Sequence, residues 1–399
     1  MAMSMTKQHA RQVIGVLCLG ELGKLVDLST ESNVLNIIQG LFESDSEDVR
    51  KAASISLGNI SVGNPQFFLD KVFALVDKSQ DQQKYLFLNT IREIIMHDSK
   101  CLEMYVDQLL DLLMSQTTNE DESIRSIVAE SLGRLFVVYS EDLIGTIEDG
   151  LTKGSLTMKA TLAKSIKYAA SKHTSQLALQ SAAFELLKLR VETDPDIKKN
   201  ALESLTTIVH NDFDLIKKEV EVFEAFAHQE TSVRKELIED VDLGPFKHKV
   251  DKGLPMRKAA FQLLEELFDK ASDHVDVSKI VQAVVLSGLS DSNEDSVVLN
   301  LHILAKLTQR SGAVVLSQIE SIVLAFEKLF QQNLKLVQTK ERSANIVRAV
   351  VRVVHLINSS EELQETPAPK FENLVQVTVL QNPDAKAIYE KAAASHKNF

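Results

Sequence analysis

Acidic clusters and histidines are the residues of this chain whose types could support catalysis or metal binding. The acidic clusters lie at 44–48, 119–122 and 193–196, and each comes directly before a stretch with helical apolar periodicity. Ser, Asn, Asp and Glu are favoured there because they cap the first turn and complement the helix dipole. The ten histidines are scattered, and no Walker loop, HExxH, GxSxG or dinucleotide fingerprint is present. We therefore expect no enzyme, no catalytic residue, no metal site and no cofactor.

A second group of charged residues lies in a segment of different character, residues 231–255. Gly244-Pro245 breaks any helix in its middle, and apolar residues alternate with polar ones on both sides. Gly at the first central position favours a type II′ turn, which predicts a β-hairpin with an apolar pair beside the tip and two opposite-charge pairs below it. These pairs are Leu243 with Phe246, Asp242 with Lys247, and Asp240 with Lys249.

This predicted hairpin is the candidate binding site. An isolated hairpin is only marginally stable in water, so a projecting one would gain most of its order from a partner. The alternative is a loop that packs on the rest of the protein. The candidate partner-binding residues are Asp240, Asp242, Leu243, Gly244, Pro245, Phe246, Lys247, His248 and Lys249.

The elements that must position this segment are copies of one repeated stretch. Residues 49–60 read VRKAASISLGNI, and similar stretches begin at Ile124, Ile197 and Met256. Apolar or small residues recur at the first, fifth, ninth and twelfth positions, which places them on one face of a helix. With looser copies included, the ninth positions are 19, 57, 91, 132, 166, 205, 264, 305 and 351. Most of these spacings are typical of HEAT or armadillo repeats.

The repeats predict an all-α fold, a HEAT-repeat α-solenoid with one β-hairpin inserted between the helices of a late repeat. We expect repeats over 1–230, the insertion over 231–255, further repeats over 256–360, and a C-terminal cap and tail over 361–399. The helix before the insertion is expected over 213–226. No partner helix precedes the first copy, residues 11–22, so we expect an exposed apolar face there. Either the chain is a fragment, or a separate N-terminal arm polypeptide completes it.

Composition argues against several classes of protein. No run of eighteen apolar residues is present, so we expect no membrane span, and the N-terminus lacks the apolar core of a signal peptide. The formal net charge of −12 argues against a dedicated nucleic-acid binder. It agrees either with a partner that presents basic surface or with acidic loops that keep a long solenoid soluble. We expect a cytoplasmic and nuclear protein.

Several segments resemble the cullin-associated, neddylation-dissociated proteins, the TATA-binding-protein-interacting (TIP) family. They are VRKELIE at 233–239, GPFKH at 244–248, GLPMRKAAF at 253–261, LGNISVGN at 57–64 and VAESLG at 128–133. The resemblance runs nearly the whole length of this chain and covers the C-terminal third of a family member. It places the TIP domain at approximately 200–380.

The resemblance implies a non-catalytic scaffold that binds the N-terminal region of an unmodified cullin. It further implies that the hairpin occupies ground needed by the adaptor, and so regulates the assembly and exchange of cullin-RING ubiquitin ligases. The family's N-terminal arm has no counterpart in these residues. Two alternatives remain open: a generic HEAT scaffold or transport receptor with other cargo, and a partner of the TATA-binding protein. The GPFKH segment favours the cullin-binding function over a transport receptor.

Overall fold

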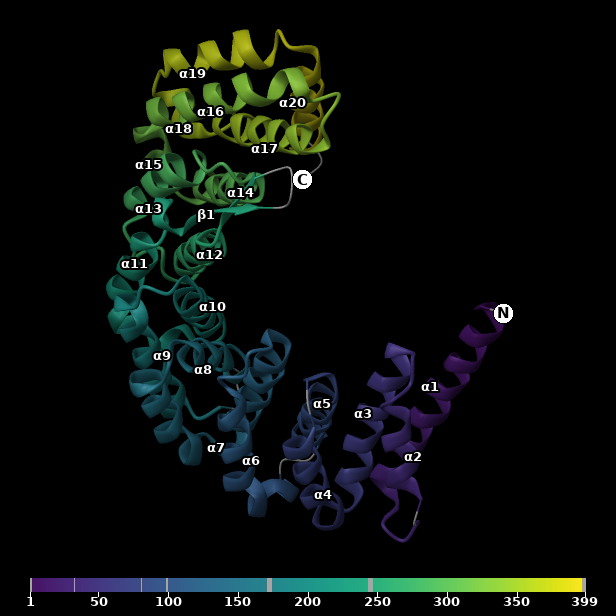
Figure 1. The fold of residues 1–399 in the computed structure, drawn as a ribbon. Helices are drawn as coiled ribbons and strands as arrows, with labels where there is room; N and C mark the ends of the chain where they lie inside the picture. Colours follow the sequence, from purple (N-terminus) through teal and green to yellow (C-terminus); the bar gives the residue numbers. More distant parts are fainter. Residues whose placement is uncertain are drawn as a thin grey trace. The chain divides into compact units, whose positions relative to one another are not determined.

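The computed structural model describes residues 2–31, 33–79, 81–97, 100–170, 174–242 and 247–396. Over these ranges the chain is almost entirely helical, with one two-stranded sheet (Figure 1). It divides into two compact units, unit 1 at Met1–Leu215 and unit 2 at Ile216–Phe399. Within the described ranges, no helix combines the length and the apolar character that a bilayer span requires.

Unit 1 is a series of α-helices joined by short turns. They are α1 (Ala2–Leu25), α2 (Val34–Leu41), α3 (Glu47–Gly63), α4 (Pro65–Lys78), α5 (Asp81–His97), α6 (Val106–Gln116), α7 (Glu122–Lys153), α8 (Leu156–Ala169), α9 (Gln176–Lys188) and α10 (Pro195–Asp212), with 3-10 turns at Lys100–Tyr105, Leu189–Val191 and Phe213–Leu215. The expected cap of α10 is confirmed: Asp194 accepts hydrogen bonds from the backbone N–H groups of Asp196 and Ile197, and Pro195 begins the helix. Helix α7 bends at Tyr139, which has non-helical backbone angles.

The repeated stretches form the row of helices predicted from the sequence. They lie in α1, α3, α5, α7, α8 and α10, and each of these helices packs on the next. Ala53, Val128 and Ala201, at the fifth position of their copies, are fully buried, and so is Ala129, which follows Val128. In unit 2 the repeated stretches also turn these positions toward the core. Of the nine ninth positions, Leu19 in unit 1 and Ala305 in unit 2 are only partly buried. The solenoid fold class is confirmed.

In two copies, the serine at the eighth position joins neighbouring helices, a feature that periodicity alone did not reveal. Ser56 Oγ of α3 donates to Val16 O of α1 at 2.6 Å, and Ser204 Oγ of α10 donates to Ala163 O of α8 at 2.7 Å. Both hydroxyls are buried, so each bond satisfies a group that would otherwise be costly to desolvate.

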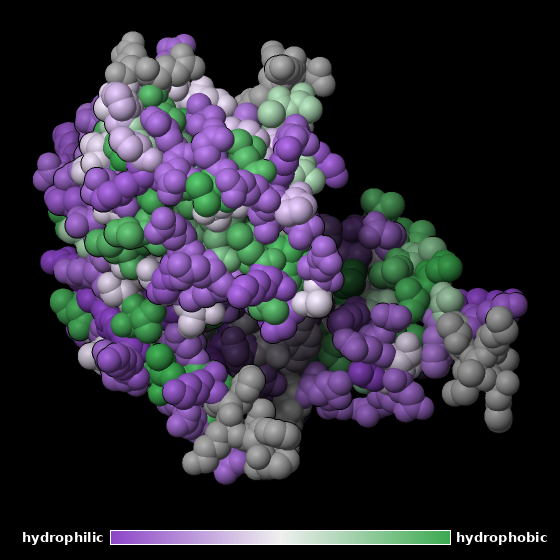
Figure 2. All heavy atoms as spheres, turned by 90° about the horizontal axis from the view of Figure 1, so that it is seen from above, coloured by the Kyte–Doolittle hydropathy of each residue, from purple (hydrophilic) through white to green (hydrophobic). Residues whose placement is uncertain are grey.

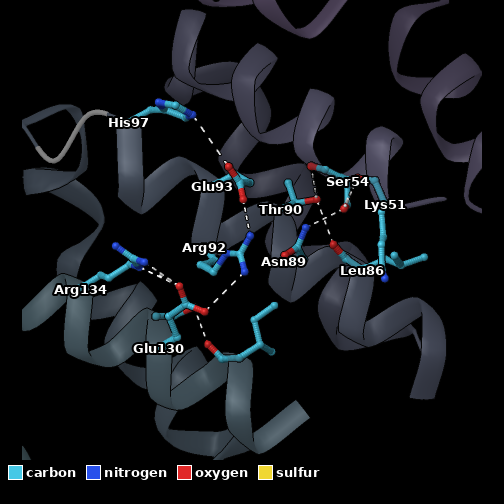
Figure 3. A network of polar contacts seen from close by, with 12 residues as sticks. Lys51, Ser54, Leu86, Asn89, Thr90, Arg92, Glu93, His97, Glu130 and Arg134 are labelled. Carbon is cyan, nitrogen blue, oxygen red and sulfur yellow. Dashed lines mark hydrogen bonds and ion pairs between the residues drawn. The ribbon is translucent and has the colours of Figure 1, made fainter. Parts of the chain in front are cut away.

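A polar network runs along the edge of the same row (Figure 3). Arg92 of α5 pairs with Glu93 of its own helix and lies 3.4 Å from Glu130 of α7, which also pairs with Arg134 at 2.8 Å. On the α3 side, Thr90 Oγ1 donates to Ser54 O at 3.1 Å. The network therefore connects three successive repeated helices.

Unit 2 continues the helical pattern and contains the sheet. Its elements are α11 (Val220–Gln229), β1 (Ile238–Asp242), β2 (Lys247–Asp251), α12 (Leu254–Ala271), α13 (Val277–Ala283), α14 (Glu294–Arg310), α15 (Gly312–Ser317), α16 (Ile319–Asn333), α17 (Glu341–Asn358), α18 (Glu361–Glu365), α19 (Pro369–Asn373) and α20 (Pro383–His396), with 3-10 turns at Lys217–Glu219, Lys235–Leu237 and Leu334–Leu336 and π-helical turns at Val284–Gly288 and Leu374–Val379. Repeated stretches lie in α12, α14 and α17.

The prediction of a helix over 213–226 is wrong for the first half of that range. Two 3-10 turns, Phe213–Leu215 and Lys217–Glu219, occupy that part, and α11 begins only at Val220. A local physical reason is Asp214, in the first of these turns, because a short polar side chain competes for backbone hydrogen bonds and favours a turn over helix interior.

Candidate binding site

The hairpin lies between α11 and α12, where the other repeats have a short turn. Strands β1 and β2 are antiparallel, and their register pairs Asp240 with Lys249 and Asp242 with Lys247. This is the register predicted from the Gly-Pro turn. The residues at the tip, Leu243, Gly244, Pro245 and Phe246, lie outside the described residues, and for Lys247 and His248 only the backbone is described.

The expected charge pairing is wrong in one described case. Asp240 and Lys249 lie opposite one another in the register, but these two side chains form no ion pair. The cross-strand ion pair instead joins Glu239 and Lys252 at 2.8 Å, closer to the base. Two exposed side chains that stay in water gain little free energy from pairing. The register is therefore held by the backbone hydrogen bonds between the strands and by the contacts at the base of the hairpin.

The register divides the hairpin into two faces, because directly opposed residues of an antiparallel pair lie on the same side. The charged face carries Asp240 and Lys249. The valine face, defined here by Val241 and Val250, lies on the other side, with the Glu239–Lys252 pair at its base. Val241 is 37% exposed and Val250 is 39% exposed. The valine face therefore leaves two apolar side chains open to solvent, and the register places Glu239 opposite Val250 and His248 opposite Val241 on the same side.

Arg257, in the first turns of α12, fixes the base of the hairpin. Its Nη2 lies 2.8 Å from Asp251 Oδ2 at the end of β2 and 3.0 Å from Asp291 Oδ2 in the turn before α14. Arg257 and Asp291 are buried. Burial opposes the charged guanidinium, but hydrogen bonds and ion pairs with Asp251 and Asp291 outweigh burial and raise the pKa of Arg257.

This use of Arg257 departs from the role of the same position in other copies. At the second position of the repeated stretch, Arg50 Nη1 donates to the carbonyl of Ser44 at 2.5 Å, and Arg125 Nη1 donates to the carbonyl of Asn119 at 2.7 Å. Each binds the turn just before its own helix. In the copy that begins at Met256 the hairpin replaces that turn, and Arg257 binds a strand and the next repeat instead.

A second contact holds the N-terminal side of the hairpin. Arg234 Nη2 lies 2.5 Å from Glu230 Oε2, and the Glu230 side chain is buried. The backbone N–H of Lys252 donates to Leu237 O at 3.0 Å and closes the base of the loop. Both ends of the hairpin are thus anchored in unit 2, while its strands project.

An anchored hairpin with exposed side chains supports binding. Across the part of the chain that the structure describes, no group of three or more His, Cys, Asp or Glu side chains could hold a metal ion. Sequence reasoning selected the hairpin but missed Arg257, Asp251 and Asp291. The one sequence signal for Arg257 was its place at the cationic second position of the repeated stretch.

Comparison with known proteins agrees with this architecture. A family model described as TATA-binding protein interacting (TIP20) matches residues 215–378, which include the whole hairpin. Cullin-associated NEDD8-dissociated protein 1 of Arabidopsis thaliana is 30% identical over 354 residues, covering 86% of this chain and 29% of the relative. The chain belongs to the family of cullin-associated NEDD8-dissociated proteins.

Other members of the cullin-associated NEDD8-dissociated family give the same result. The protein 1 of Dictyostelium discoideum is 29% identical over 384 residues, covering 93% of this chain and 30% of the relative. A protein of Emericella nidulans, named as the C-terminal part of protein 1, is 26% identical over 301 residues, covering 74% of this chain and 28% of that protein. The chain thus spans less than a third of the length of these relatives.

Solved structures confirm the fold of this family member at the level of architecture. The Kap95 chain in a complex with RanGDP matches with a TM-score of 0.53 at 13% identity, covering 89% of this chain and 50% of that chain. Kap95 in a complex with Nup1 matches with a TM-score of 0.53 at 15% identity, covering 91% and 52%. At such low identity these matches establish the helical-repeat fold alone.

Proposed function

We propose that this chain is a non-catalytic scaffold, acting in the cytoplasm and the nucleus, that binds the N-terminal region of an unmodified cullin. In this proposal the hairpin occupies a surface of the cullin to which the adaptor of a cullin-RING ubiquitin ligase must bind. The chain would thereby regulate the exchange of adaptors and their substrate receptors. Family membership supports the cullin as partner, because the relatives are named as cullin-associated proteins.

The observation that carries the proposal is the projecting hairpin with its open valine face. Arg257 and Glu230 anchor its base, while Val241 and Val250 remain exposed. The alternation of the sequence assigns Leu243 and Phe246 to the same side as these valines. Apolar and aromatic side chains on an anchored support are the usual energetic centres of an interface, so this side suits a desolvated pocket on the cullin.

Adaptor displacement tests the proposal. The parent chain, a deletion of residues 240–250, Phe246→Ala and Lys249→Ala are titrated into a preformed cullin–adaptor complex, and adaptor release is measured. We expect the deletion and Phe246→Ala to displace poorly and Lys249→Ala to behave like the parent, because exposed charges contribute little. If the deletion releases adaptor as well as the parent does, the hairpin is passive and the proposal fails.

A partner of the TATA-binding protein is the second candidate. It is favoured by the description of the matching family model and by the net charge of −12, which suits a basic factor. Saturable binding to purified TATA-binding protein, together with no binding to cullin, would favour it over the scaffold.

A further partner is proposed for unit 1, a separate N-terminal arm polypeptide. A groove of about 620 Å³ lies between α1 and α3 and is lined by His9, Ala10, Val13, Ile14, Leu17, Ser46, Asp48, Lys51, Ala52 and Ile55. Ile14 is 64% exposed, and Figure 2 shows hydrophobic residues gathered over this end of unit 1. An apolar helix from the arm would cover this surface. This proposal is tested by measuring whether a recombinant fragment of the N-terminal arm binds to this chain.

A further inference from the structure

Two neighbouring helices of unit 2 carry no carboxylate beyond their first turns. Residues 296–310 of α14 and 342–358 of α17 contain no Asp or Glu, although these two types account for 56 of the 399 residues of the chain. The two helices pack against each other. Their cations are Lys306, Arg310, Arg342, Arg348 and Arg352.

The fold itself neutralises some of these cations. Lys306 lies 2.5 Å from Glu265, and Arg310 lies 2.8 Å from Asp269, both acids being on α12. Arg342 lies 3.6 Å from Glu294 in the first turn of α14. These three charges are therefore satisfied within unit 2.

Arg348 and Arg352 are different. Both are exposed, and no carboxylate of the described residues lies within ion-pair distance of either. Helix α20, on the other side of α17, pairs its own Glu390 with Lys386 at 3.9 Å. The other described arginines of unit 2 all have a carboxylate partner; they are Arg234, Arg257, Arg310 and Arg342.

These two arginines belong to a continuous exposed line along α17, the arginine stripe, formed by Arg342, Asn345, Arg348 and Arg352. Arg348 and Arg352 are one helical turn apart, where two like charges repel and slightly destabilise a helix. Among the described residues, no carboxylate pairs with either arginine to offset that repulsion. The arrangement is therefore better explained by a group outside the chain.

We propose that the arginine stripe is a docking surface for an acidic segment of a protein partner. Guanidinium groups bind carboxylates through paired hydrogen bonds, and a segment with carboxylates about one helical turn apart would match Arg348 and Arg352. Nucleic acid is the less suitable ligand, because the chain is acidic and phosphate binding needs many clustered cations. The inference rests on the proposed function only in the choice of cullin as the first partner to test.

The test compares two charge reversals in unit 2. Arg348→Glu/Arg352→Glu changes the stripe, and Lys217→Glu/Lys218→Glu makes the same change in net charge at two exposed residues of a 3-10 turn. Affinity for full-length unmodified cullin is measured over a series of salt concentrations. We expect the stripe variant to bind about tenfold more weakly at low salt, with a flatter salt dependence, and the control to stay within about twofold of the parent. Equal weakening in both variants, or none in the stripe variant, overturns the proposal.

A second arm separates this inference from the proposed function. If the parent chain does not bind cullin, the proposed function fails, and binding to poly-L-glutamate and to a single-stranded oligonucleotide is measured instead. Loss of poly-L-glutamate binding in the stripe variant alone supports the stripe, whereas tighter binding of the oligonucleotide overturns the assignment to an acidic protein. Melting curves verify folding, and Arg348→Ala/Arg352→Ala replaces the reversal if that variant unfolds.

Discussion

Arg257 and Asp251 form an ion pair, with Nη2 and Oδ2 2.8 Å apart, that joins the end of β2 to the first turns of α12. Arg257 also pairs with Asp291, which is buried in the turn before α14. One guanidinium therefore connects the hairpin, its own repeat and the next repeat. The base of the hairpin is therefore held by a buried guanidinium that two carboxylates share.

Asp251→Asn should loosen the hairpin without unfolding unit 2. Arg257 keeps its partner Asp291, so we expect a loss of unfolding free energy of about 1 kcal/mol and faster amide exchange in 238–251. Arg257→Met leaves the buried carboxylate of Asp291 unpaired and should cost about 3–5 kcal/mol. Urea unfolding and hydrogen-exchange mass spectrometry measure the two effects. The control is Glu239→Gln, which removes the exposed pair with Lys252; if it speeds exchange as much as Asp251→Asn, the buried pair is not what orders the hairpin.

The two faces of the hairpin should differ in their effect on adaptor displacement. Val241→Ser/Val250→Ser removes apolar surface worth about 1.5 kcal/mol per buried side chain, so we expect displacement to need at least about tenfold more protein. Asp240→Ser/Lys249→Ser, the matched change on the charged face, should have little effect. A titration of the cullin–adaptor complex measures both. A larger loss with the charged-face variant would show that the partner contacts the charged face, and the assignment to the valine face would be wrong.

Gly133 and Gly145 test the close packing of the repeated helices, because both lie within α7. A Cβ at Gly133 would lie 2.3 Å from the backbone oxygen of Ser165, whereas a Cβ at Gly145 meets nothing within 4 Å. Gly133→Ala should therefore destabilise unit 1 by about 1–3 kcal/mol. Gly145→Ala should stabilise it by about 0.5–1 kcal/mol, since alanine costs less backbone entropy in a helix. Chemical denaturation distinguishes the two, and equal effects would contradict the contact between α7 and α8.

Ile14 should control self-association through unit 1. Its side chain borders the groove between α1 and α3, and exposed apolar surface of this kind favours association. Sedimentation velocity should show concentration-dependent association of the parent chain that Ile14→Glu abolishes. Leu156→Glu replaces another exposed apolar residue of unit 1 and should leave association unchanged. A parent chain that stays monomeric at high concentration would contradict this prediction.

Much of the fold could be predicted because its signals are local. The four-four-three spacing of apolar residues placed Ala53 and Leu57 on one helix face, and both are fully buried. The Gly244-Pro245 turn and the alternation around it predicted the register that pairs Asp240 with Lys249. Helical periodicity and turn geometry depend on neighbouring residues, so the sequence alone determined the repeats, the phase of their helices and the place of the hairpin.

Only the tertiary structure decided how the hairpin is held and which face it presents. Asp291 is far from Arg257 in the sequence and reaches it only because α12 and α14 pack together. The ion pair of Glu239 with Lys252, in place of Asp240 with Lys249, likewise depends on side-chain geometry at the base. The exposure of Val241 and Val250 follows from what the rest of unit 2 leaves uncovered. Such contacts join residues distant along the chain, and their energies arise from burial and approach in three dimensions, which no local pattern encodes.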